Sequence, residues 1–307
     1  MRILIVGAGA TGGYFGGRLL EAGRDVTFLV RPGRAEQIRR DGLVIVSPHG
    51  DVTLAPKTVL ASEIAQPFDI VILAVKAYAL EQALADLKPA IGPATMIVPL
   101  LNGMRQVDLL VRDFGEAPVL GGVCIVATML DAQNRVVQLA GMQELKYGER
   151  DGSTSDRVRR LHDALSGAGF ETTLSTTILQ EMWEKWVMLA TAGALTCLLR
   201  GTVGEIEALP NGADLPPRFL AETAAVAAAA GYPPPEAVLA RTRTMLMAKG
   251  SPWAPSMYRD LQVNAPVEVE QILADMALRG ARSGIATPLL DAATAQLRIY
   301  QARRAAA

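Results

Sequence analysis

The sequence predicts an α/β protein in two parts, with a mainly parallel sheet between helices in the first part and helices alone in the second. Two observations carry this prediction. Short β-branched runs alternate with helix-like segments through the first half of the 307 residues, which is typical of βαβ units. Beyond about Ser175 strand-like runs vanish, and long Ala/Leu/Met-rich stretches continue to the end. We therefore expect one domain over residues 1–175 and a second over 176–307.

The strands of the parallel sheet are expected where apolar runs are short and buried in character. These runs are residues 3–6, 25–30, 69–75 and 95–99, with helices at 13–22 and 78–87. Residues 43–54 indicate an inserted hairpin, and residues 118–147 indicate further strands at one edge of the same sheet. A helix at 157–166 and a strand at 171–174 are expected to close the first domain.

The second part is expected to be all-helical. Its proline-rich joints at 215–217 and 232–235 fit helix boundaries. The small side chains of Ala224 to Ala230 fit close packing between helices, and a homodimer interface is the alternative.

Composition excludes several classes of function. Thirty basic residues against thirty-one acidic ones leave a net charge of −1, without a basic stripe for nucleic acid. The uncharged stretch from Trp186 to Leu199 is shorter than the roughly 20 residues of a membrane-spanning helix, and the first apolar run is too short for a targeting signal. Two cysteines and two histidines favour neither a disulfide framework nor a metal site. We expect a cytoplasmic protein.

A glycine-rich turn follows the first expected strand. It reads Gly7-Ala8-Gly9-Ala10-Thr11-Gly12 and precedes a helical pattern, which is the context of a Rossmann-type dinucleotide site. The first glycine permits the tight turn, the second lets the backbone approach a pyrophosphate, and the third lets the helix pack closely. A merely flexible loop is the alternative.

The end of the second strand favours NADP over NAD. An NAD enzyme usually has a carboxylate there, whereas this chain has Arg31, whose guanidinium suits a 2′-phosphate. The alternative is a solvated surface arginine, and this description applies more strongly to Arg34. Lys76, after the strand at 69–75, is a candidate for a phosphate, a ribose or a substrate carboxylate. Asn102 is a candidate for substrate or nicotinamide, although Asn-Gly is also a common turn pair.

Three polar residues of the second part are candidates for chemistry. Lys185 stands just before the uncharged stretch, at the mouth of an expected buried helix, where a charged ammonium is costly and a proton donor is favoured. A lysine reaching to solvent from a helix end is the alternative. Ser256 and Glu268, taken separately, are typical of a helix N-cap and a solvated carboxylate at a helix start.

Taken in order, these motifs resemble the ketopantoate reductase (2-dehydropantoate 2-reductase) family over essentially the whole chain. The matching pieces are residues 7–13, Arg31, 75–77, 101–103, 182–185, 204–205, 256–260 and the segment around Glu268. The resemblance implies a helical domain like the C-terminal domain of 6-phosphogluconate dehydrogenase. It also implies NADPH-dependent reduction of ketopantoate to pantoate, a step of pantothenate biosynthesis.

The resemblance further implies individual roles. Lys185 would donate a proton to the 2-oxo group, and Glu268 would orient the lysine and the substrate. Asn102 and Ser256 would contact the substrate, while Arg31 and Lys76 would serve the cofactor.

The chain also departs from the family pattern. Asparagines are usual where it has Leu189, Gly193 and Val203, and Gly-Arg-Pro-Thr-Glu is usual where it reads Asn264 to Glu268. Losing such polar groups can change substrate choice, so a less hydroxylated or more apolar substrate is a second hypothesis. Two rival functions are a hydroxyacid dehydrogenase working in the oxidative direction and a non-catalytic sensor that binds NADP.

Overall fold

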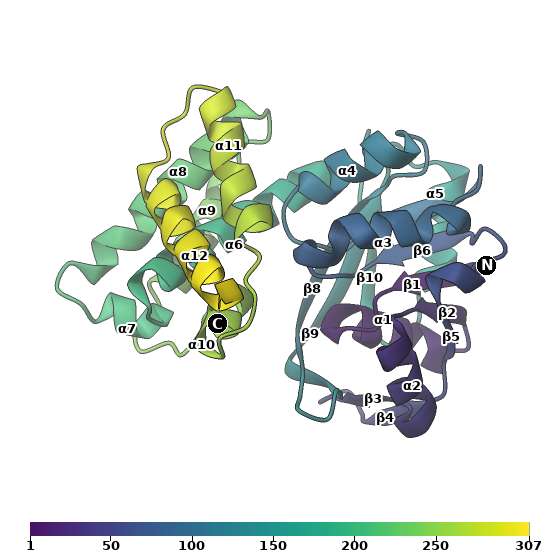
Figure 1. Ribbon diagram of the computed structural model, residues 1–307. Coiled ribbons are helices and arrows are strands. Elements are labelled where there is room, and N and C mark those ends of the chain that lie inside the picture. The colour runs from purple at the N-terminus through teal and green to yellow at the C-terminus, as the bar shows by residue number, and fades with distance from the viewer. Residues whose placement is uncertain (307) are drawn as a thin grey trace. The chain divides into compact units, whose positions relative to one another are not determined.

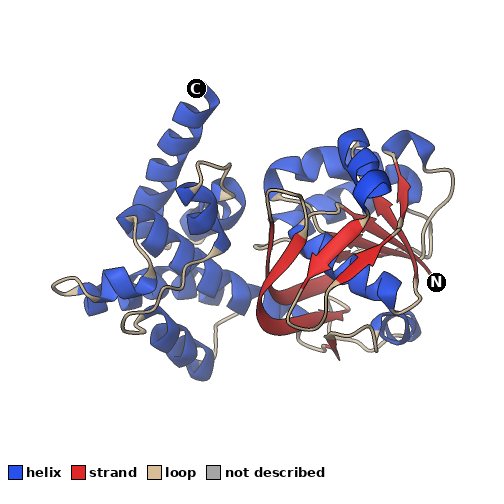
Figure 2. Ribbon diagram, turned by 90° about the horizontal axis from the view of Figure 1, so that it is seen from below, coloured by secondary structure: helices blue, strands red, loops and turns tan. Residues whose placement is uncertain are grey.

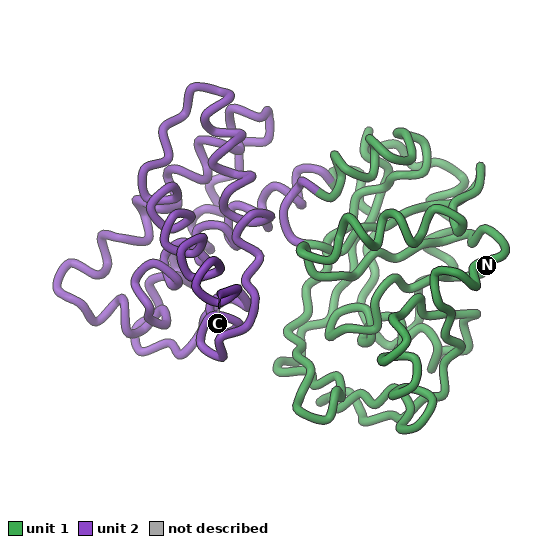
Figure 3. The backbone as a smooth tube through the Cα atoms, viewed as in Figure 1, with its two compact units in different colours: residues 1–101, 106–178 green, residues 102–105, 179–307 purple. Residues whose placement is uncertain are grey.

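The computed structural model describes residues 1–306 of the chain. The chain divides into two compact units, which are drawn in different colours in Figure 3. Unit 1 comprises residues 1–101 and 106–178, and unit 2 comprises residues 102–105 and 179–307. The short segment 102–105 therefore belongs to unit 2, although the chain on either side of it belongs to unit 1.

Unit 1 contains the predicted parallel sheet. Its five strands run in the order β5-β2-β1-β6-β7, and every neighbouring pair is parallel. The strands are β1 (Arg2–Val6), β2 (Asp25–Leu29), β5 (Lys57–Val59), β6 (Ile70–Leu73) and β7 (Met96–Pro99). Every residue of β6 and β7 is buried, as expected for a parallel sheet covered on both faces.

The strand order reverses between β1 and β6. From β1 the chain moves outward to β2 and β5, and then returns to the other side of β1 for β6 and β7. Right-handed crossovers therefore place α1 (Ala10–Glu21) and α3 (Leu80–Leu87) on opposite faces, as Figure 1 shows. Helices α2 (Pro32–Asp41) and α4 (Arg105–Phe114) follow β2 and β7. The carboxyl ends of β1 and β6 are where such sheets bind ligands.

The remaining strands form a second sheet, and this corrects the expectation of one enlarged sheet. Its strands are β3 (Leu43–Val46), β4 (Val52–Leu54), β8 (Gly121–Leu130), β9 (Val136–Gly148) and β10 (Glu171–Leu174), while α5 spans Asp156–Leu165. The predicted hairpin is confirmed, because β3 and β4 pair antiparallel. Only Val119, just before β8, pairs with the first sheet, at Ile97. Long β9 pairs with β8, β10 and β3, and a local sequence pattern does not reveal the pairing with the distant β3.

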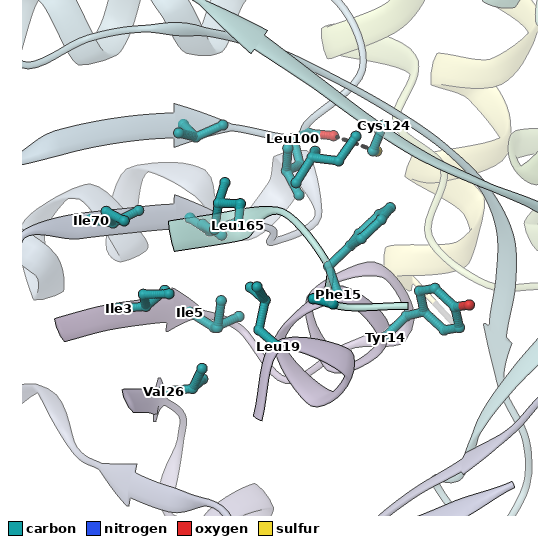
Figure 4. Packing of buried hydrophobic residues seen from close by; sticks show 14 of the residues in the cluster. Ile3, Ile5, Tyr14, Phe15, Leu19, Val26, Ile70, Leu100, Cys124 and Leu165 are labelled. Atoms are coloured by element: carbon teal, nitrogen blue, oxygen red, sulfur yellow. Dashed lines mark hydrogen bonds between the residues drawn. The ribbon is translucent and has the colours of Figure 1, made fainter. Parts of the chain in front are cut away.

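Helix α1 lies between the two sheets and packs closely on both. A Cβ atom on Gly16 would come within 2.7 Å of Ile5 and Phe28 in the first sheet, and one on Gly17 within 2.5 Å of Ile45 in the second. The side chains of α1 that fill the core are larger: Phe15 and Leu19 are fully buried and lie with Ile3 and Ile5 in one cluster (Figure 4). The glycines of α1 thus set the distance between the sheets.

Unit 2 is helical, as predicted: from residue 179 to residue 306 the structure contains helices and loops and no strand (Figure 2). Its helices are α6 (Ile178–Leu199), α7 (Val203–Glu207), α8 (Leu215–Ala229), α9 (Glu236–Leu246), α10 (Ser256–Gln262), a π-helical turn (Glu270–Ala274), α11 (Asp275–Arg282) and α12 (Pro288–Ala306). Both proline-rich joints are helix starts, since α8 has proline in its first turn and Pro235 caps α9. None of the helices within residues 1–306 is both long and apolar enough to span a membrane.

Candidate active site

The glycine turn joins β1 to α1 in a conformation that only its glycines allow. Gly7 has φ +96°, a region that side chains disfavour, and its N–H donates to the Leu29 carbonyl at the end of β2 over 3.0 Å. A Cβ atom on Gly12 would lie 2.1 Å from the Gly7 carbonyl oxygen. The helix therefore rests directly on the turn.

Gly9 is different, because the protein itself does not require a glycine there. Its backbone is extended, with φ −83° and ψ −162°, and a Cβ atom would meet nothing within 4 Å. Gly9 is also the N-cap of α1 and provides no side-chain cap, so the first N–H groups of the helix face no capping side chain. Open space in front of such N–H groups fits the pyrophosphate of a dinucleotide.

The end of β6 lies against this turn. A Cβ atom on Gly7 would lie 3.0 Å from Cγ1 of Val75, and one on Gly12 would lie 3.0 Å from Cβ of Ala74. Half-buried Lys76 follows directly and caps the 3-10 turn Ala77–Ala79. The structure thus brings the Lys76 segment to the glycine turn, at the reversal point of the first sheet.

The two arginines after β2 have different surroundings. Arg31 is exposed and is the N-cap of α2. Arg34 is half-buried, and its Nε donates to the Ala8 carbonyl of the glycine turn over 3.0 Å. The expectation that Arg34 is a solvated surface residue is therefore wrong. Its position depends on the tertiary fold, because Nη1 also donates to the Asn134 carbonyl before β9 over 3.0 Å.

In unit 2, Lys185 lies inside a helix rather than at its mouth. Helix α6 begins at Ile178, so Lys185 is its eighth residue and is half-buried. The expected location was wrong because the polar segment before Lys185 is helical as well. Trp183 and Trp186 on either side of it are buried, with their ring centroids 4.9 Å apart.

Trp186 and Gln271 join three segments of unit 2. The Trp186 indole Nε1 donates to the Ile272 carbonyl in the π-helical turn over 2.9 Å, and the buried Gln271 amide donates to the Asn102 carbonyl over 2.9 Å. Gly103 is held equally closely, since a Cβ atom there would lie 2.8 Å from the Gln271 carbonyl oxygen and 3.5 Å from the Trp186 indole nitrogen. The Asn102 segment is thus fixed next to the Lys185 helix and the segment that follows Glu268.

Ser256 and Glu268 also depart from their ordinary descriptions. Pro255, not Ser256, is the N-cap of α10, and Ser256 is the first helical residue. Glu268 is 8% exposed, so it is not a solvated carboxylate. The half-buried Ser256 hydroxyl and Asn102 amide have no hydrogen-bond partner within residues 1–306. Both groups are therefore available to a polar ligand.

Two of the three positions where family members usually have asparagine have apolar surroundings. Val203 is fully buried with Ala192 and Leu246. A Cβ atom on Gly193 would lie 2.4 Å from Cε of Met257, so the methionine occupies the space of a side chain at position 193. Leu189 is half-buried.

Two residues at the site were missed by the sequence analysis. Gln271 had no local signal, since its partner Asn102 is 169 positions away. Arg34 did have a signal, because a second arginine three residues after Arg31 follows the same strand end. Its burial could not be read from that spacing.

The parallel sheet, the glycine turn and the helical unit together define a dinucleotide-dependent oxidoreductase. Comparison with known families agrees. The protein-family model described as ketopantoate reductase PanE/ApbA matches residues 3–152, and the family model of its C-terminal part matches residues 177–301. The chain belongs to the ketopantoate reductase family and is an oxidoreductase that acts on CH–OH groups.

Individual relatives cover nearly the whole chain. An uncharacterized oxidoreductase, YkpB, of Bacillus subtilis (strain 168) is 34% identical, over 99% of this chain and 100% of its own length. The crystal structure of 2-dehydropantoate 2-reductase from Geobacter metallireducens GS-15 superposes with a TM-score of 0.87 at 29% identity, over 97% of this chain and 99% of that one. D-Mandelate dehydrogenase, solved with NADH and anilino(oxo)acetate, shares the fold at 24% identity, with a TM-score of 0.89 over 99% of each chain.

Proposed function

We propose that the protein reduces a 2-oxo acid to a 2-hydroxy acid with NADPH, and that ketopantoate, reduced to pantoate for pantothenate biosynthesis, is its first candidate substrate. One observation carries the proposal: Trp186 and Gln271 tie together the segments of Lys185, Glu268 and Asn102. Carbonyl reduction requires a proton donor, and a carboxylate and an amide can orient that donor and the substrate. The name of the Geobacter metallireducens relative supports ketopantoate.

In the proposed reaction, reduced nicotinamide supplies the hydride that C2 of the substrate receives. Lys185 Nζ donates a proton to the 2-oxo oxygen as negative charge develops there, a contribution worth about 10²–10⁴-fold. Glu268, which is buried, orients the ammonium. The Asn102 amide and the Ser256 hydroxyl hydrogen-bond the substrate and fix C2 in one orientation.

The choice of NADPH rests on charge at the end of β2. Arg31 is exposed at that strand end, where a guanidinium can bind a 2′-phosphate in a bidentate manner. Lys76, at the end of β6, adds a second positive charge on the cofactor side. We expect Arg31→Gln to weaken NADPH binding and to leave NADH binding unchanged.

The test is NADPH oxidation by the purified protein over a panel of 2-oxo acids that includes ketopantoate. Lys185→Ala should lower kcat by about 10²–10⁴-fold and leave the Kd for NADPH unchanged. Lys249→Ala, which removes an exposed lysine of the same unit, is the matched control and should behave as wild type. Equal turnover by wild type and Lys185→Ala would refute the assigned role.

A second candidate is a 2-oxo acid with an apolar side chain. The specific observation is that Met257, next to Ser256, fills the space at Gly193 where family members usually have asparagine. An apolar surface there would disfavour the hydroxyl of ketopantoate. The same panel decides between them: if ketopantoate has the highest kcat/KM the first candidate stands, and if an apolar acid exceeds it the second does.

The same panel tests the non-catalytic sensor, and a second assay with 2-hydroxy acids tests the dehydrogenase. Turnover of any carbonyl substrate that Lys185→Ala abolishes excludes a non-catalytic sensor. Oxidation of 2-hydroxy acids with NADP+ at a higher kcat/KM than the reverse reaction would favour the dehydrogenase.

A further inference from the structure

Arg34 is a half-buried cation placed on the glycine turn. It lies in the first turn of α2, and its Nε donates to the Ala8 carbonyl over 3.0 Å. Its Nη1 donates to the Asn134 carbonyl over 3.0 Å and to the Gln37 side chain. Its Nη2 is buried and has no hydrogen-bond partner within residues 1–306. The guanidinium is therefore held in a fixed place, with one nitrogen still unsatisfied.

The partners of Arg34 are all neutral. No carboxylate within residues 1–306 pairs with it, whereas two other inward-facing arginines of unit 1 have one. Arg18 pairs with Glu21 over 2.7 Å, and Arg157 pairs with Glu149 over 2.5 Å. Burial of Arg34 without a carboxylate lowers the pKa of its guanidinium. A positive charge in such surroundings is costly unless an anion compensates it.

An anion that fits this place is the phosphate part of a dinucleotide. The Ala8 carbonyl that Arg34 holds belongs to the turn whose next residue, Gly9, leaves open space in front of the helix N-terminus. We propose that Arg34, like Arg31, is a cofactor-binding arginine: it fixes the glycine turn through Ala8 and adds positive charge for the pyrophosphate. Because NADH and NADPH share the pyrophosphate, Arg34 strengthens the binding of both, in contrast to Arg31.

The proposal rests on dinucleotide binding by the family and is independent of the substrate and of the preference for NADPH. Its test is the Kd of the full-length protein for NADPH and for NADH, measured by fluorescence titration. We expect Arg34→Gln to raise both values by the same factor, about tenfold to 100-fold, as for a lost hydrogen-bonded charge. Arg34→Lys retains the charge and should recover part of the affinity for both.

Two controls keep the outcomes separate. Arg39→Gln, an exposed arginine on the same helix whose side chain is 77% exposed, should change neither Kd. Arg31→Gln should raise the Kd for NADPH alone. If the Kd for NADPH does not rise, the proposed preference for NADPH is refuted, and the inference about Arg34 is unaffected.

The inference is overturned if Arg34→Gln changes neither Kd, or if it weakens NADPH alone. If Arg34→Gln does not fold, Arg34→Lys decides: a smaller rise in both Kd values by one factor supports the inference, and two unchanged Kd values overturn it.

Discussion

The candidate regions of the two units are built in different ways. In unit 1 the glycine turn consists of backbone: Gly7 and Gly12 allow a turn on which a helix rests, and Gly9 leaves open space. In unit 2 the candidate group consists of side chains from three segments, joined by Trp186 and Gln271. The turn tolerates no added atom at Gly12, whereas the side-chain group depends on individual hydrogen bonds.

The largest effect on stability is expected at Gly12. In Gly12→Ala the new methyl group would meet the Gly7 carbonyl at 2.1 Å, and backbone cannot move aside as a side chain can. We expect a loss of at least about 3 kcal/mol in the free energy of unfolding, measured by denaturant titration. Gly33→Ala, where a Cβ atom meets nothing within 4 Å, is the control and should not destabilise. A Gly12→Ala protein as stable as this control would contradict the account of the turn.

The next largest effect is expected at Trp186. Trp186→Phe removes the donor to the buried Ile272 carbonyl and should cost about 1–3 kcal/mol beyond the loss of ring volume. Trp183→Phe supplies the comparison, since Trp183 is equally buried and stacks on Tyr232 but donates no hydrogen bond within residues 1–306. Equal destabilisation by the two variants would show that ring volume, rather than the indole N–H, holds unit 2 together.

Gly193 is expected to have a smaller effect. Gly193→Ala brings a methyl group within 2.4 Å of Met257 Cε, the end of a flexible side chain that can rotate away. We expect a cost of about 1 kcal/mol, which should disappear when the same change is made in a Met257→Ala background. A cost that persists in that background would place the close contact elsewhere.

The smallest effect on stability is expected at Gly9, where a change in ligand affinity should occur without a change in stability. Gly9→Ala should change the free energy of unfolding by less than about 0.5 kcal/mol, because its methyl group meets nothing within 4 Å. The same variant should raise the Kd for the dinucleotide at least about tenfold, as expected when a charge-assisted hydrogen bond is lost. Unchanged affinity would show that no ligand approaches the turn at Gly9.

The sequence predicted what local patterns determine. The parallel sheet, the glycine turn and the helices of unit 2 follow from periodicity and from glycine and proline positions, and the structure confirms them. The second sheet was not predicted, because β9 pairs with β3, which lies far earlier in the chain, as well as with its sequence neighbours β8 and β10.

The side-chain part of the site was harder to predict for the same reason. Lys185 was singled out for a position at a helix mouth that it does not have. The burial of Arg34 depends on Asn134, and the position of Asn102 depends on Gln271. Six roles stay predictions, those of Lys185, Glu268, Asn102, Ser256, Arg31 and Lys76. The variants above test the roles of Lys185 and Arg31.

The glycines of α1 also affect the order in which the protein folds. Four of the twelve residues of this helix are glycine, and each weakens a helix by about 1 kcal/mol relative to alanine. Helix α1 is therefore unstable as an isolated segment and forms only when both sheets enclose it. One contact is supplied by Val136 of β9, which lies 2.8 Å from a Cβ atom built on Gly13. We therefore expect a nascent chain that ends before residue 136 to contain the whole glycine turn and yet to lack this contact on α1 until β9 has been synthesised and has paired.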